Sequence, residues 1–324
     1  SQIVQMQETA RALANIDVLV SLAEVAFKYN YVCPELNNRS EIKIYDGRHP
    51  VVERLLEREI FVPNNTTLNN NDERMIIITG PNMAGKSTYM RQTALIALMA
   101  QVGCFVPAQS ANIGLSDRIF TRVGASDDLA SGQSTFMVEM QEVSYILRNA
   151  TRNSLILLDE IGRGTSTYDG MSIARAVVEY IDKKIHGFTL FATHYHELSD
   201  MSDGSSKIKN YTVTVKERGK DVVFLRRIVP GCADRSYGIH VARLAGLPES
   251  LLKRADDILE GLEESDGKGY HAPSAPSNEA RETGLDLFAS PIINELADLD
   301  VMSKTPIEAM EILFRLSKEA KESR

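Results

Sequence analysis

Residues 80–87, with the sequence GPNMAGKS, fit the G-x-x-x-x-G-K-[ST] pattern of a phosphate-binding loop, or P-loop. The pattern follows the apolar run RMIIITG and precedes a helical pattern, the context that such a loop requires. Lys86 can place its charge on the β- and γ-phosphates, and the Ser87 hydroxyl can ligate Mg²⁺. The backbone amides from Asn82 to Ser87 can point at phosphate oxygens. The sequence therefore predicts an ATP and Mg²⁺ site formed by Gly80, Pro81, Asn82, Met83, Ala84, Gly85, Lys86, Ser87 and Thr88.

Two acidic residues end the apolar run SLILLDE at 154–160. In a parallel sheet the carboxyl end of this strand would lie beside the P-loop, where Asp159 can hold Mg²⁺ through water. Glu160 would then polarise the attacking water as general base. Because many buried strands end in Asp, this signal carries weight only together with the P-loop about seventy residues earlier.

A third polar group follows the run TLFATH, where His194 comes just past a predicted strand. We expect His194 to contact the γ-phosphate or the attacking water. The alternatives are a surface histidine, or a metal pair with His196, for which no third ligand is evident in the sequence.

The elements that must position these groups alternate between buried strands and helices. This alternation predicts an α/β fold with a largely parallel sheet and helices on both faces. A helix at 2–28, a strand at 41–47 and a hairpin at 211–228 with its turn at ERGK complete the pattern. The core strands are expected at 74–80, 155–160 and 189–194, and the core helices at 86–102, 135–149 and 170–184.

The C-terminal part reads as two helices within 235–264 around AGLP, a linker at 265–284, and a tail whose helix starts near Pro306. The linker is rich in Pro, Ser, Gly and charge, so we expect it to be disordered. The helix pair could be a DNA-binding helix-turn-helix. Its second helix, 249–264, has two basic and six acidic residues, a charge of 2 − 6 = −4, which phosphates would repel. We therefore expect a packing role.

Composition gives an ordinary soluble chain of 324 residues with a net charge of 36 − 44 = −8, which argues against a broad DNA-binding surface. No apolar run is long enough to span a bilayer. The N-terminus has neither the basic region nor the apolar core of a signal peptide, and we expect a fragment of a longer protein. Cys33, Cys104 and Cys232 are far apart, so they are expected to be reduced, buried thiols of a cytosolic protein.

Five motifs in order resemble the MutS family of DNA mismatch repair ATPases, of the bacterial type, from residue 1 to about 263. They are DGRHPVVE (46–53), TGPNMAGKSTYMRQ (79–92), STFMVEM (134–140), LLDEIGRGTSTYDG (157–170) and ATHYHEL (192–198). The resemblance implies an ABC-type P-loop ATPase in which STFMVEM stands where transporter-type ATPases carry a Gly-rich signature. The sequence is similar only to the C-terminal, ATPase-bearing portion of that family.

The resemblance also implies roles for particular residues. Ser134, as the N-cap of a short helix, would approach the γ-phosphate in the site of the other subunit of a homodimer. Asp169 and residues 162–167 would line the subunit interface. Phe61 resembles the aromatic residue that stacks on adenine in the family.

The implied domains are the end of a lever region (1–38), the ATPase domain (39–234), a helix-turn-helix dimerisation element (235–264), the linker (265–284) and the tail (285–324).

The implied partners are mismatched double-stranded DNA, bound through domains absent from this chain, and a MutL-type repair protein. GLDLF (284–288) resembles the bacterial clamp-binding pentapeptide, so Leu285–Phe288 is a candidate sliding-clamp site; the alternative is a hydrophobic anchor for 285–322. The resemblance implies a cytoplasmic, nucleoid-associated protein.

Two other functions remain open on sequence grounds. The chain could be a nucleotide-regulated scaffold that recruits repair partners with little hydrolysis. It could also belong to the MutS-like recombination-suppressing paralogues or to transporter-type ATPases. The former usually carry a nuclease-like tail and the latter need the Gly-rich signature, and this sequence has neither.

Overall fold

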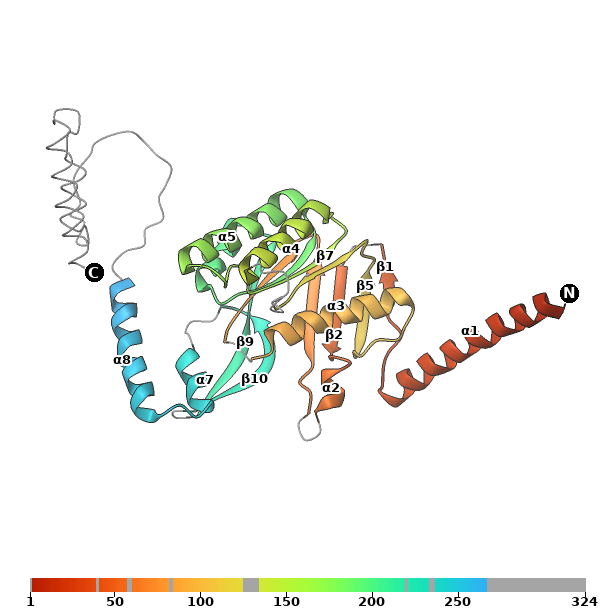
Figure 1. Ribbon diagram of the computed structural model, residues 1–324, viewed down its shortest axis with the longest axis horizontal. Helices are drawn as coiled ribbons and strands as arrows, with labels where there is room; N and C mark the ends of the chain where they lie inside the picture. The colour runs from red at the N-terminus through yellow and green to blue at the C-terminus, as the bar shows by residue number, and fades with distance from the viewer. Residues whose placement is uncertain are drawn as a thin grey trace, which may run out of the picture. The chain divides into compact units, whose positions relative to one another are not determined.

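A computed structural model describes residues 2–38, 41–56, 60–81, 84–124, 134–218, 221–232 and 237–266 (Figure 1). The chain divides into two compact units, Ser1–Leu262 and Glu263–Arg324, and nearly all the described residues belong to the first. The helices are α1 (Gln2–Lys28), α2 (Val52–Leu55), α3 (Lys86–Val102), α4 (Thr135–Asn149), α5 (Thr167–Tyr180), α6 (Met201–Gly204), α7 (Gly238–Leu244) and α8 (Glu249–Asp266). The strands are β1 (Glu35–Asn37), β2 (Glu41–Gly47), β3 (Asn64–Asn69), β4 (Met75–Thr79), β5 (Ser110–Gly114), β6 (Ile119–Arg122), β7 (Leu155–Asp159), β8 (Phe188–Ala192), β9 (Ile208–Arg218) and β10 (Asp221–Pro230).

The larger sheet has six strands in the order β10-β9-β4-β8-β7-β6. Every neighbouring pair is parallel except the β9–β10 hairpin at one edge. The prediction of an α/β fold with a largely parallel sheet is confirmed for this sheet. The three strands expected to lead into the site, β4, β8 and β7, are adjacent in it, and each is fully buried as its apolar run predicted.

Alternation along these strands separates two hydrophobic cores. Ile76 and Ile78 of β4 face the core that contains α3, whereas Met75 and Ile77 face the core that contains α4 and α5. Because successive side chains of a strand point to opposite faces, a continuous apolar run is what a strand covered by helices on both sides needs. Figure 1 shows α3 crossing the strands, and α4 and α5 lying together.

A second sheet, in the order β1-β5-β2-β3, was not predicted beyond its strand β2. Its pairs β2–β3 and β2–β5 are antiparallel and β1–β5 is parallel. The sheet shares the α3 core through Ile42, Ile44, Leu68 and Ile113, so α3 is buried from two directions. The sequence NNTTLN of β3 is mostly polar, and a strand with one buried face leaves no continuous apolar run to detect.

Several expected boundaries differ from the structure. α5 begins at Thr167 and not at 170, because the Ser166 hydroxyl caps the helix by accepting the Asp169 N–H; it ends at Tyr180, followed by a π-helical turn at Ile181–Ile185. The hairpin spans 208–230, longer than the expected 211–228, and β10 contains a bulge between Phe224 and Ile228. α8 reaches Asp266, two residues into the expected linker, whose remainder lies outside the described residues, as does the tail.

The surface corrects one further expectation. Cys33 and Cys232 are exposed and only Cys104 is partly buried, so the expectation of buried thiols was wrong; all three are free. Cys33 precedes β1 and Cys232 follows the end of β10, where no core covers them. Leu251, Leu252 and Ile258 belong to an apolar stripe along α8. Leu252 is buried, whereas Leu251 and Ile258 are 50% and 47% exposed. Part of the stripe therefore has no cover within this chain's described residues.

Two glycines set how closely α5 approaches the turn after β7. Gly162, at φ +88°, and Gly170, in α5, face each other so tightly that a Cβ on either would overlap the backbone of the other. A Cβ on Gly170 would also meet the hydroxyl of Tyr195. The turn that follows Asp159 therefore packs directly against α5.

We expect Gly170→Ala to destabilise the chain, although alanine is intrinsically the better helix former. Forcing a methyl group into a closed contact costs about 1–3 kcal/mol, more than the ~0.5–1 kcal/mol that alanine gains within a helix. The matched control is Gly261→Ala in α8, where nothing lies within 4 Å of the added Cβ. Thermal unfolding should show a lower midpoint for Gly170→Ala only; equal midpoints would contradict the close contact.

Candidate functional site

The carboxyl ends of β4, β8 and β7 meet at one edge of the six-stranded sheet. Ile78 is opposite Ala192, and Ala192 is opposite Asp159. Two further backbone hydrogen bonds continue the ladder past the strand ends: Thr193 N–H donates to Ile78 O at 3.0 Å and Glu160 N–H donates to Ala192 O at 2.9 Å. The structure thus brings together the three segments that the sequence singled out.

The loop between β4 and α3 has the backbone that its glycines permit. Gly80 and Gly85 have φ values of +127° and +104°, in the left-handed region that favours glycine. Gly85 caps α3 without a side-chain hydrogen bond, so no side chain covers the first amides of this 17-residue helix. Pro81, Ala84 and Thr88 lie in or beside this loop, whereas Asn82 and Met83 lie outside the described residues.

Lys86 is buried at the mouth of this loop. Its Nζ donates to the carbonyl oxygens of Gly80 at 2.5 Å and Pro81 at 3.0 Å. Burial lowers the pKa of Lys86, while the charges of Glu160 and Asp159 raise it. The ammonium is therefore held by neutral carbonyl groups in a position where an anionic ligand would compensate its desolvation.

Asp159 is buried at the end of β7 and incompletely partnered. The Ser87 side chain hydrogen-bonds its carboxyl group, but Oδ1 has no hydrogen-bond partner among the described residues. Burial raises the pKa of Asp159, and Glu160 raises it further. A buried carboxylate oxygen without a donor, beside a hydroxyl, is a set of oxygen ligands that fits Mg²⁺. Ser87 and Asp159 thus fit the predicted metal role.

Glu160 has φ +53°, an unusual conformation for a residue with a side chain, and it forms an ion pair with Arg163 at 2.6 Å. A cavity of about 300 Å³ lies between this pair and the loop, lined by Pro81, Gly85, Lys86, Ser87, Thr88, Glu160 and Arg163. A second cavity of about 460 Å³ is lined by Ser87, Asp159 and Glu160 together with Thr135 and Glu139 of α4. The predicted general base therefore borders both cavities.

His194 follows β8 at the same edge, exposed, with its ring 4.1 Å from that of Tyr195. Partial desolvation lowers the pKa of His194, and Arg163 and Lys86 lower it further against the opposing effect of Glu160. The charged groups that shift the pKa of His194 thus include Lys86, Glu160 and Arg163, which line the cavity beside the 80–88 loop. For the alternative of a metal pair with His196, the described residues contain no group of three or more His, Cys, Asp or Glu side chains that could hold a metal.

Phe61 lies by a separate cavity of about 200 Å³, which also touches Gly85, Thr88 and Arg226. The β10 bulge forms one wall, and Asn64 holds it by donating to Arg226 O at 3.0 Å and accepting from Ile228 N–H at 2.7 Å. An aromatic ring next to the end of the 80–88 segment is where a base attached to a loop-bound phosphate chain could stack.

Two residues expected at the subunit interface, Ser134 and Asp169, are exposed at the amino ends of α4 and α5. Ser134 caps α4, and its Oγ accepts the Met137 N–H at 3.2 Å. Asp169, in the first turn of α5, accepts from the Ser166 hydroxyl at 2.8 Å. Both side chains are open to solvent in this chain. Residues 130–133, just before Ser134, lie outside the described residues.

The model of MutS domain V matches residues 76–263 of the chain. The chain belongs to the MutS family. It is 55% identical over 328 residues to the DNA mismatch repair protein MutS of Acetivibrio thermocellus, covering 99% of this chain and 38% of that protein. It is 60% identical over 288 residues to the protein of the same name from Lachnoclostridium phytofermentans, covering 87% of this chain and 31% of that protein. This MutS-family chain thus spans well under half the length of these relatives.

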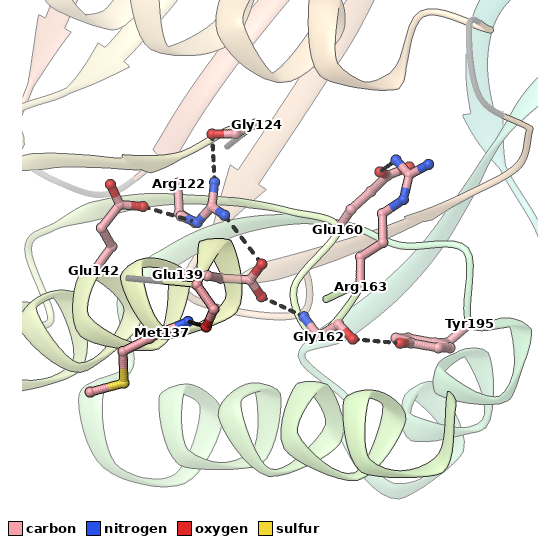
Figure 2. Close-up of polar contacts among 10 residues, drawn as sticks. Arg122, Gly124, Met137, Glu139, Glu142, Glu160, Gly162, Arg163 and Tyr195 are labelled. Carbon is pink, nitrogen blue, oxygen red and sulfur yellow. Dashed lines mark hydrogen bonds and ion pairs between the residues drawn. The ribbon is translucent and has the colours of Figure 1, made fainter. Parts of the chain in front are cut away.

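This MutS-family domain contains a buried polar network that the sequence did not predict (Figure 2). Glu139, Arg122, Gly162 and Tyr195 join α4, β6 and the turns after β7 and β8. A signal was present: Glu139 lies on the buried stripe of α4 with Val143 and Ile146, a core position that normally holds an apolar residue. Phe136 and Met140 of the same helix are half-buried.

No helix in the described part of the chain has both the length and the apolar character to cross a bilayer.

We expect Asp159→Asn to stabilise the ligand-free chain. The wild-type carboxylate is buried with an unpartnered oxygen, and an amide removes the desolvation cost of the charge. Single stabilising substitutions commonly add ~0.5–2 kcal/mol, and we expect a gain of that order. Urea unfolding at neutral pH without nucleotide or Mg²⁺ should show the gain, with Asp182→Asn as a contrasting control, because Asp182 is paired with Arg74 at 2.6 Å and should lose stability. A loss in both variants would mean that the Asp159 charge is compensated.

Proposed function

We propose that this chain is the ATP-binding and ATP-hydrolysing module of a DNA mismatch repair protein, with the architecture of an ABC-type P-loop ATPase. The observation that carries the proposal is the meeting of Lys86, Ser87, Asp159 and Glu160 around two cavities beside the amino end of α3, which share Ser87 and Glu160 as lining residues. A desolvated ammonium, uncapped helix amides and an unpartnered carboxylate oxygen are what a metal-bound triphosphate would satisfy together.

In this proposal the residues of the site divide the work. The 80–88 loop and Lys86 bind the phosphates, and Phe61 stacks on the adenine. Ser87 and Asp159 would hold Mg²⁺, which when bound neutralises charge on the β- and γ-phosphates. Glu160 orients the attacking water and takes its proton, and His194 contacts the γ-phosphate or that water. For this, the Glu160 carboxylate must leave Arg163, its partner in the ligand-free chain.

The proposed site is completed by a second copy of the chain. Ser134 is exposed at the amino end of α4, a 15-residue helix, and would contact the γ-phosphate bound by the other subunit. Asp169 would line the same interface. The uncovered stripe of α8, with Leu251 and Ile258 exposed, suits the proposed helix-turn-helix dimerisation element of residues 235–264.

The wider role follows from the family. Nucleotide state would set the fit between protomers, and the helical segment 1–38 would carry that change toward domains that bind mismatched DNA. ATP binding would favour a closed dimer that slides on DNA, and hydrolysis would reset it. A MutL-type protein, and a sliding clamp through Leu285–Phe288, are the proposed partners of this cytoplasmic, nucleoid-associated protein. The same proposal divides the chain into the end of a lever region (1–38), the ATPase domain (39–234), the dimerisation element (235–264), the linker (265–284) and the tail (285–324).

A nucleotide-regulated scaffold with little hydrolysis is the alternative. It is favoured by one observation, the Arg163–Glu160 ion pair, which occupies the proposed general base. ATP turnover that disappears in Lys86→Ala would decide against the scaffold.

We expect Glu160→Gln to bind ATP and accumulate as a dimer while hydrolysing it at least about 100-fold more slowly, the usual contribution of a general base. Phosphate release and light scattering with ATP measure the two effects. Glu179→Gln is the control, since Glu179 is a surface residue paired with Lys183. Normal turnover in Glu160→Gln would remove Glu160 from the base role.

We expect a mixture of Lys86→Ala and Ser134→Ala chains to recover ATP turnover that each variant alone lacks. In the mixed dimer one site carries both defects and the other carries none. Verified subunit exchange is the control. Exchange without recovery would contradict the composite site and assign Ser134 to its own chain's site.

A further inference from the structure

The carboxylate of Glu139 connects α4 to the turn that carries Glu160. Glu139 is 5% exposed, and its Oε1 accepts the backbone N–H of Gly162 at 2.6 Å. Its Oε2 pairs with Nη2 of Arg122 at 3.2 Å, and Arg122 is in turn held by Gly124 O and by Glu142. Figure 2 shows these groups converging between α4 and the turn after β7.

Gly162 is held from its other side as well. Its carbonyl oxygen accepts the hydroxyl of Tyr195 at 3.1 Å, and Tyr195 follows His194 directly. Gly162 lies two residues after Glu160, and both have positive φ values, +88° and +53°. This conformation is ordinary for glycine but unfavourable for Glu160, which persists in it only where its surroundings hold the turn. The anchors of the turn, two residues away at Gly162, are one carboxylate and one phenol.

The same carboxylate belongs to the helix that Ser134 opens. Glu139 lies five residues after Ser134 in α4, and a buried charged group tolerates little displacement from its partners. A movement of α4 therefore pulls on Gly162, and a movement of the Glu160 turn pulls on α4. Each chain would present Ser134 to one nucleotide and Glu160 to the other.

We propose that Glu139 is a positioning residue that makes the amino end of α4 and the Glu160 turn move as one unit, so that each nucleotide site senses the occupant of the other. This inference rests on the proposed function, because it takes Ser134 as acting in trans and Glu160 as the base. Glu139 acts through its hydrogen bond to Gly162, two residues after Glu160.

The first arm of the test compares Glu139→Ala, Glu139→Gln and Glu142→Gln in the otherwise unchanged chain. Glu139→Ala should lower kcat for ATP by about 10- to 100-fold with KM near the wild-type value, because a misplacement of ~1 Å at a base costs up to roughly 100-fold. Glu139→Gln keeps an acceptor for Gly162 N–H and should recover most of kcat. Glu142→Gln is the matched control, since Glu142 pairs with the same Arg122 but does not contact Gly162, and should behave as wild type.

Three results of this arm would overturn the positioning role: Glu139→Gln as slow as Glu139→Ala, a change in KM instead of kcat, or an equal loss in Glu142→Gln. Circular dichroism and the thermal midpoint verify folding. If Glu139→Ala does not fold, Tyr195→Phe takes its place, because it deletes only the hydroxyl that holds Gly162 O. A lower kcat in Tyr195→Phe then supports the role and an unchanged kcat overturns it.

The second arm separates the two sites by adding Glu139→Ala, or Tyr195→Phe in its place, to the Lys86→Ala plus Ser134→Ala mixture. On the Ser134→Ala chain it acts through Glu160 of the intact site. On the Lys86→Ala chain it acts only through the Ser134 that this chain supplies to the intact site. Slower turnover in both mixtures supports the linkage, and parental turnover in either one overturns it. If the parental mixture does not recover turnover, the composite site is disproved, and the coupling between the two sites is disproved with it. The first arm still decides whether Glu139 positions Glu160.

Discussion

The parallel pairing of β8 with both β4 and β7 is the constraint on which the site depends. It places the ends of three strands at one edge, so that a loop, a carboxylate pair and a histidine that are far apart in sequence become neighbours. Parallel pairing requires a crossover after each strand, and α3, α4 and α5 lie in these crossovers and cover the two faces. The edge that carries the candidate site and the hydrophobic core therefore both follow from this strand pairing.

The site is electrostatically unsatisfied in the ligand-free chain. Burial lowers the pKa of Lys86 and raises the pKa of Asp159, two shifts that both reflect charges removed from water without full compensation. Glu160 has an unfavourable backbone conformation, and its carboxylate forms an ion pair with the exposed Arg163. Such costs are tolerated where a ligand later offsets them, which is consistent with the proposed binding of a metal-bound triphosphate.

The polar network of Glu139, Arg122, Gly162 and Tyr195 differs from the two hydrophobic cores. The cores consist of aliphatic and aromatic side chains, whose packing has weaker directional requirements than hydrogen bonding. Hydrogen bonds are directional, so this network orients the turn after β7 in a way that apolar packing could not. The close contact between Gly162 and Gly170 sets the distance between the same turn and α5.

Local sequence patterns were enough to predict the elements that carry an uninterrupted signal. The 80–87 pattern, the buried strands β4, β7 and β8, and helices α3 and α4 were predicted within a residue or two, because their periodicity and apolar runs are local properties. The motif order was also sufficient to predict the family. The roles of the site residues remain predictions.

Only the tertiary structure decided what depends on contacts between distant segments. The strand β3 is mostly polar and is recognised by its pairing with β2; Cys33 and Cys232 are exposed because no element covers them. Local sequence does not identify Arg163 as the partner of Glu160, the unpartnered oxygen of Asp159, or Gly162 as the partner of Glu139. The physical reason is that hydrogen bonding and desolvation depend on three-dimensional neighbours, whereas periodicity depends on the chain alone.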